Sequence, residues 1–82
     1  MTLPTIHRNG TSAKDLQAGY DAAAYALEAF SDAMSNIEFN SRDYYVQNDQ
    51  AWNQAVEERQ TISEKIKEVS NYLQEIREHL YA

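Results

Sequence analysis

The stretch LQAGYDAAAYALEAFSDAMSNI, residues 16–37, decides the fold class of this chain. Its apolar residues recur at alternating steps of four and three, which is the heptad spacing of one helix face. These positions are Leu16, Tyr20, Ala23, Leu27, Phe30, Met34 and Ile37. The spacing predicts an amphipathic helix over about residues 12–37. Thr11 or Ser12 is expected to cap it, with Asp15 in a position like that of a capping box.

A second run with the same spacing fills the C-terminal portion of the chain. It comprises Trp52, Ala55, Arg59, Ile62, Ile66, Val69, Leu73, Ile76 and Leu80. Together with Asn48 and Asp49 as cap candidates, this run predicts a helix over about residues 49–81. An arm of residues 1–11 and a loop of about residues 38–48 complete the chain. The predicted fold is a single all-α domain, residues 1–82: a long two-helix hairpin with an extended N-terminal arm, oligomerising into a helical bundle.

Chain length is the reason to expect oligomerisation. A domain of 82 residues buries only about 60% of the surface that its unfolded chain exposes. There is no cysteine, and the two histidines, His7 and His79, stand far apart without metal-ligand spacing, so neither disulfides nor a metal compensates. Gly19 and the alanines around it would let another backbone approach closely. We therefore expect a homo-oligomer, a dimer or a tetramer, with no cofactor.

Charge and composition exclude several classes of protein. The formal net charge of -6 disfavours binding to duplex nucleic acid, because such a surface repels phosphate. No apolar run has the length of a signal peptide or a membrane span, and the absence of cysteine fits a reducing compartment. These features predict a soluble, cytoplasmic protein that does not act on membranes. No nucleophile stands at a readable spacing from a base, so we expect a binding module rather than an enzyme.

The arm ends in TIHRNGTS, residues 5–12, which has the composition of an anion site. Backbone N–H groups of Gly10, Thr11 and Ser12 would gather at the positive end of the first helix. His7, Arg8 and Asn9 stand immediately before them. The alternative is purely structural, with Asn9 and Gly10 forming a turn and the hydroxyl residues a cap.

The loop EFNSRDYYVQND, residues 38–49, offers complementary chemistry. Arg42 supplies a guanidinium, Tyr44 and Tyr45 supply two stackable rings, and Gln47 supplies an amide. The alternative is that the tyrosines plug the end of the helix pair, and we expect one ring to pack and the other to reach outward. Arg59 lies on the predicted seam, where it either snorkels, pairs with a carboxylate of a neighbouring chain, or binds a ligand phosphate.

The two motifs Thr-Ile-His-x-Asn-Gly-Thr-Ser and Arg-Asp-Tyr-Tyr-x-Gln together resemble those of a widespread family of small phage-encoded helical proteins. The resemblance spans nearly the whole chain. One departure is Asn40-Ser41, where relatives often have Asn-Gly before the second motif. By size, helical class and phage origin, the resemblance implies a counter-defence role similar to that of the anti-CBASS sponges. Those oligomeric proteins sequester cyclic dinucleotide alarm signals of the infected bacterial host.

Two functions from different classes follow. The first is a sponge that binds a small anionic ligand such as a cyclic dinucleotide without cleaving it, using both loops at subunit boundaries. The second is an acidic helical inhibitor or adaptor, a charge mimic that engages a basic host protein. The grouping of Arg42, Tyr44 and Tyr45 in one loop favours the sponge, because a charge mimic does not need it. A plain structural or assembly role is the third possibility.

Overall fold

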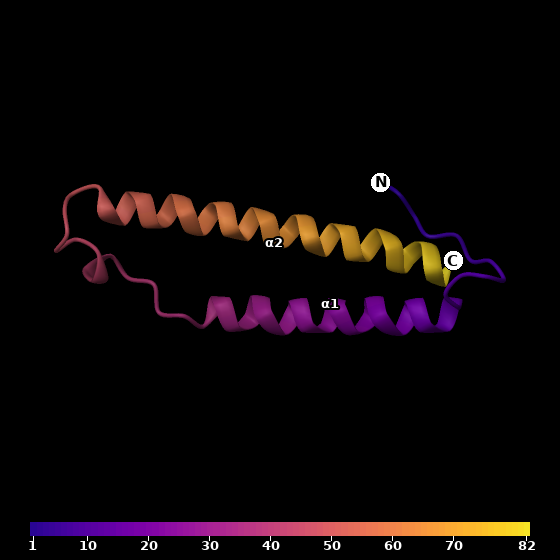
Figure 1. Ribbon diagram of the computed structural model, residues 1–82. Helices are drawn as coiled ribbons and strands as arrows, with labels where there is room; N and C mark the ends of the chain where they lie inside the picture. The colour runs from indigo at the N-terminus through magenta and orange to yellow at the C-terminus, as the bar shows by residue number, and fades with distance from the viewer.

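The computed structural model describes residues 1–82 and is entirely helical. Helix α1 spans Ala13–Ser35, a short 3₁₀ helix spans Ser41–Asp43, and helix α2 spans Ala51–Tyr81. The two long helices run antiparallel, side by side, in a rod of 60 × 22 × 19 Å (Figure 1). The predicted all-α hairpin is confirmed. Neither helix combines enough length with enough apolar character to cross a lipid bilayer.

The start of α1 follows the capping chemistry in its sequence. Ser12 has extended backbone angles, and its side-chain oxygen accepts a hydrogen bond of 3.1 Å from the N–H of Asp15. This bond satisfies one of the N–H groups that a helix start leaves without a partner. The helix ends at Ser35, two residues before the predicted limit, where the N–H of Asn36 bonds to the carbonyls of Asp32 and Ala33.

The start of α2 corrects a prediction. Its N-cap is Gln50, which makes no side-chain capping bond, so neither Asn48 nor Asp49 caps the helix. The side chain of Asn48 instead accepts a hydrogen bond of 2.9 Å from the N–H of Gln50. This is the local turn that Asn favours, because its short side chain reaches a backbone N–H two residues on. The helix therefore begins two residues later than predicted.

The face of α1 that contacts α2 is also different from the predicted seam. Tyr20, Leu27 and Met34 are half-buried, as expected. Phe30 and Ile37, however, are 49% and 50% exposed. Ala23 on α1 and both Ile62 and Val69 on α2 are exposed as well. The physical reason is that a single partner helix covers only one stripe, so the apolar positions along one edge of the heptad seam are left on the flank of the hairpin.

The hydrophobic core is small and lies mostly near one end of the rod. Only four of the 82 residues are buried, and three of them, Leu73, Ile76 and Leu80, belong to the last turns of α2. The N-terminal arm returns alongside these turns (Figure 1), where the His79 Nε2 lies 2.7 Å from the Pro4 carbonyl oxygen. The side-chain amide of Gln17 donates to the carbonyl of Leu80, at 2.9 Å, and ties α1 to the same end.

Candidate functional site

At the opposite end of the rod, the loop forms an aromatic cluster with the first turns of α2. The ring of Trp52 lies 4.8 Å from that of Phe39 and 5.7 Å from that of Tyr44, measured between centroids. These are favourable distances for offset and edge-to-face aromatic pairs. Tyr45 stays outside the cluster and is 65% exposed. The expectation that one tyrosine packs and the other reaches outward is confirmed.

Arg59 completes this cluster from the helix side. Its guanidinium carbon lies 4.5 Å from the centroid of the Phe39 ring, a cation–π contact. The side chain is half-buried, and neither of the two ion pairs in the chain includes it. The Phe39 ring therefore covers the guanidinium of Arg59 but does not neutralise its charge. A carboxylate partner would neutralise it. Pairing with a carboxylate of a neighbouring chain stays a prediction.

Two shallow grooves border Arg59. The first has a volume of about 540 Å³ and the second of about 200 Å³. Beside Arg59 and apolar groups, their walls carry short hydroxyl and amide side chains, namely Ser31, Ser35, Gln60 and Ser63. One carboxylate, Glu64, also lines the larger groove. A guanidinium among hydroxyls supplies the donors that a phosphate oxygen accepts.

Arg42 and Gln47 lie in the same loop as the cluster and are both exposed. The only partner of Arg42 is Glu38, with 3.9 Å between Nη2 and Oε2. A surface pair of this kind contributes about 0–1 kcal/mol, so it holds the guanidinium weakly. The loop end of the rod thus presents Arg42, Tyr45 and Arg59, of which only Arg42 has a carboxylate partner.

The arm loop differs in some respects from the predicted anion site. The N–H of Gly10 donates to the carbonyl of His7 at 3.1 Å, so it closes a turn and is not free. The N–H groups of Thr11 and Ser12 donate to no backbone carbonyl. A Cβ on residue 10 would stand 2.7 Å from Nε2 of His7, so the exposed imidazole of His7 would have to turn aside if residue 10 carried a side chain. Arg8 and Asn9 in the turn are exposed.

The two loops do not meet within one chain. The turn at residues 7–10 lies beside the C-terminal end of α2, whereas residues 38–50 lie at the far end of the rod (Figure 1). The hairpin is 60 Å long and does not fold back on itself. A single chain therefore does not bring His7–Ser12 to Arg42–Gln47, and folding back as a way to join the two predicted halves is ruled out.

A polar network between the helices was not predicted from the sequence. The Arg77 Nε donates to Asp21 Oδ1 at 2.8 Å, and the Tyr81 hydroxyl donates to the other oxygen of Asp21. Arg77 also lies over the ring of Tyr25, at 5.7 Å. A signal was present, because Asp21 with Tyr25 and Arg77 with Tyr81 are each one helical turn apart. The network was missed because the helix predictions used only the apolar heptad positions, and both pairs lie outside these positions.

The pKa of Asp21 responds to this network. The hydrogen bond from Tyr81, and after it that from Arg77, lowers the pKa of Asp21 below its ordinary value. Bonds to the charged carboxylate favour it over the protonated form. The same interaction with Asp21 raises the pKa of Tyr81.

We therefore expect an acid-dependent contribution to stability from Asp21. Because the folded-state pKa is lowered, this contribution is present above the unfolded pKa of about 3.9 and is lost as pH falls through the folded value. Urea unfolding at pH 7 and at about pH 3 measures it. The Asp21→Asn variant should lose less stability between these two conditions than the wild type. An equal loss in both proteins would mean that the network does not favour the ionised carboxylate.

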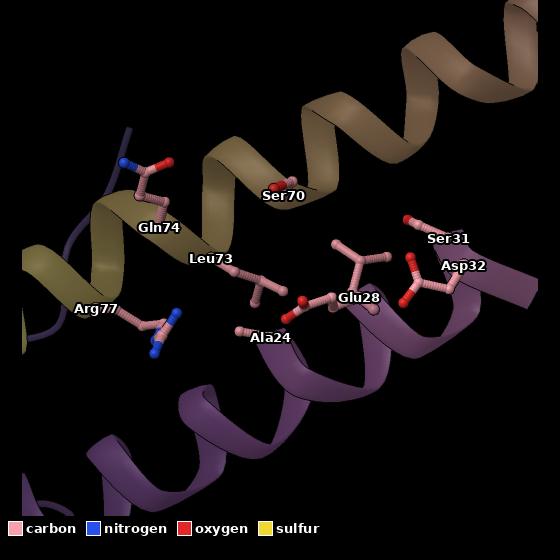
Figure 2. Close-up of a pocket in the computed structure, with 9 residues that line it drawn as sticks. Ala24, Glu28, Ser31, Asp32, Ser70, Leu73, Gln74 and Arg77 are labelled. Atoms are coloured by element: carbon pink, nitrogen blue, oxygen red, sulfur yellow. The ribbon is translucent and has the colours of Figure 1, made fainter. Parts of the chain in front are cut away.

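The same side of the hairpin carries a polar groove of about 510 Å³ next to this network. Glu28 and Asp32 of α1 line it opposite Ser70, Gln74 and Arg77 of α2, as Figure 2 shows. Nowhere along the chain do three His, Asp or Glu side chains gather as metal ligands would. The groove is therefore a polar surface with more carboxylates than cations. We refer to this side of the rod as the polar flank.

Comparison with known proteins identifies no relative of the chain. No protein-family model, no curated protein and no solved structure matches it.

Proposed function

We propose that this chain is a phage-encoded counter-defence protein that sequesters a cyclic nucleotide immune signal, without cleaving it, in the cytoplasm of the infected bacterium. The resemblance of its two motifs to those of small phage proteins is one support. The geometry adds a second, at the loop end of the rod. The ligand class that fits both is a small molecule with phosphates and flat bases.

The observation that carries the proposal is the state of Arg59. Its charge is held against Phe39 without a carboxylate partner, beside two grooves that carry hydroxyl groups. Arg42 and the exposed ring of Tyr45 stand in the adjacent loop. A phosphate would pair with the guanidinium groups, and a base would stack on the free tyrosine. In the proposed site, Arg8, Asn9 and the free N–H groups of the arm come from a second copy.

The polar flank supports the second candidate, an acidic inhibitor or adaptor of a host protein. Glu28 and Asp32 lie along one groove, and the net charge of the chain is -6. A basic protein surface would be attracted to such a flank. The second candidate gives no role to Tyr45 or to the unpaired Arg59, so we place it behind the first.

The test is a thermal-shift screen with cyclic di- and trinucleotides, followed by calorimetry with the strongest binder. A ligand of the native state stabilises it by about 2.7 kcal/mol at a hundredfold excess over Kd. Arg42→Ala and Arg59→Ala should each weaken binding by about 1.5–3 kcal/mol, because a charged hydrogen bond is lost. Tyr45→Ala should cost about 1–3 kcal/mol through lost stacking.

Lys67→Ala is the matched control, since it removes an exposed cation of α2 away from the loop and should leave affinity unchanged. Far-UV circular dichroism verifies that each variant keeps its helices. If no nucleotide raises the melting temperature, or if the three loop-end variants bind as well as the wild type, the protein-binding candidate takes the lead.

A further inference from the structure

One side of the hairpin is apolar, exposed and free of charge along α1. The three charged residues between positions 16 and 37 are Asp21, Glu28 and Asp32, and all of them belong to the polar flank or its Arg77 network. Phe30 follows Glu28 by two residues and so lies roughly 160° around the helix from it. Tyr72 of α2 is related to Gln74, in the polar groove, in the same way. The apolar residues therefore face away from the polar flank.

We call this side the apolar flank. It consists of Ala23, Ala26, Phe30, Ala33 and Ile37 from α1 and the residues just after it, with Ile62, Val69 and Tyr72 from α2, all of them exposed. Gly19 continues the same side, and nothing lies within 4 Å of the position that its Cβ would take. The close backbone approach that Gly19 and the alanines predict is thus not made within one chain.

The accessible surface of the chain is too large for a protein of its mass. It measures 6474 Å², whereas a folded monomer of 9.4 kDa exposes about 5,000 Å². The excess is roughly 1,500 Å², and obligate subunit interfaces bury about 1,000–2,500 Å² on each partner. The whole hairpin exposes this excess, and the apolar flank is the part of it along α1 that carries no charge. A partner with an extended apolar surface would cover the flank, and a second copy of this chain carries such a surface of the same length.

We propose that two copies of the chain pack antiparallel along their apolar flanks. The antiparallel direction follows from four residues that repeat every seven positions along one side of α1, namely Leu16, Ala23, Phe30 and Ile37. A twofold axis near Ala26 sets the ring of Phe30 against Ala23 of the partner subunit, and Ile37 against the partner's Leu16. Large residues then face small or complementary ones, which fills space without overpacking. A parallel pair would set each Phe30 against the partner's Phe30 and leave a gap between the two Ala23 positions.

The antiparallel pairing also extends the ligand site at the loop, a step that rests on the proposed function. In one chain, the turn of the N-terminal arm at residues 7–10 and the loop of residues 38–50 lie at opposite ends of the 60 Å rod. In the pair, the arm of each copy lies beside the loop of the other. Residues His7–Ser12 of one chain then lie beside Arg42 and Tyr45 of the other, and two equivalent sites result. The grooves at Arg59 open on the polar flank, because Ser31 lines both the polar groove and one groove at Arg59.

Disulfide trapping tests the pairing without any nucleotide. The chain has no native cysteine, so each introduced cysteine can pair only with its copy in another chain. Near the twofold axis, Ala26→Cys should form a covalent dimer under mild oxidation. Ala33→Cys should not, because its two copies would lie roughly 20 Å apart along the axis, beyond the about 7 Å that a disulfide spans. Cross-linking of both variants would show a parallel pair, and cross-linking of neither would mean that the flanks do not meet. Either result overturns the proposal.

Native mass spectrometry provides the second measurement. The wild type should be dimeric, or an assembly of dimers, at low micromolar concentration. Phe30→Glu should weaken self-association at least tenfold, since it buries a charge in the apolar flank. Ser70→Glu adds the same charge on the polar flank and should leave the assembly intact. A monomeric wild type, or equal assembly of both variants, contradicts the proposed interface.

Mixing experiments separate the interface from the shared site. Arg42→Ala and Arg8→Ala chains should each bind the nucleotide more weakly on their own, and an exchanged mixture should regain part of the lost affinity. Mixed dimers contain one site built from an intact arm and an intact loop. If Ala26→Cys forms the covalent dimer but the mixture of variants does not regain nucleotide binding, the proposed interface stands and the proposal of a shared site is wrong. Failure of every nucleotide to bind would affect only the proposed function.

Discussion

Replacement of Ile76 by alanine is expected to lower the free energy of unfolding by about 3–5 kcal/mol. Ile76 is 1% exposed and is the most completely buried large side chain of the chain. It lies among the few residues where α1, the end of α2 and the arm come together. Four buried residues leave little apolar contact to compensate for a cavity. A loss of this size is comparable to the whole stability of a domain this small.

Urea unfolding followed by far-UV circular dichroism measures the loss, at one fixed protein concentration because self-association would shift the midpoint. Leu73→Ala should cost about 2–5 kcal/mol for the same reason. The control Glu64→Ala removes an exposed side chain of the same helix and should change stability by less than about 0.5 kcal/mol. A larger effect for Glu64 than for Ile76 would mean that the faces of α2 are assigned incorrectly.

The sequence predicted the fold because local signals and the heptad spacing agree along most of the chain. Both helices stand within two residues of their predicted limits, and Ser12 caps α1 through Asp15 as expected. The separation of Tyr44 from Tyr45 was also predictable, since two adjacent rings cannot both enter one small cluster. In these cases the deciding interactions join residues that are close in sequence.

The contact face and the site were not predictable in the same way. Heptad spacing identifies a broad apolar stripe on α1 but does not say how much of that stripe a single partner helix covers. Phe30 and Ile37 were therefore placed in the hairpin seam, although they remain exposed. Arg59 was expected to snorkel, to pair with a carboxylate of a neighbouring chain or to bind a phosphate, because the sequence does not show that Phe39 reaches it. The distance between the two loops depends on whether the hairpin stays straight or folds back, and the fold shows that it stays straight over 60 Å.

Replacement of Trp52 by alanine is expected to lower the free energy of unfolding by about 2–4 kcal/mol. Trp52 is half-buried and holds the rings of Phe39 and Tyr44 against the start of α2. Without Trp52, the ring of Phe39 loses a packing contact, and its cation–π contact with Arg59 is no longer held in one geometry. The variant should therefore lose stability and also bind the nucleotide more weakly, although Trp52 itself is not assigned a ligand contact.

Tyr45→Ala is the matched control, because it removes an aromatic ring from the same loop that is 65% exposed and outside the cluster. Its stability should change by less than about 0.5 kcal/mol, while its nucleotide affinity should fall. Chemical denaturation and calorimetry on both variants give four values that separate packing from binding. If Trp52→Ala unfolds like the wild type, the aromatic cluster does not hold the loop. If Tyr45→Ala loses stability while affinity is unchanged, that ring packs against protein, and the loop end is a structural plug rather than a ligand site.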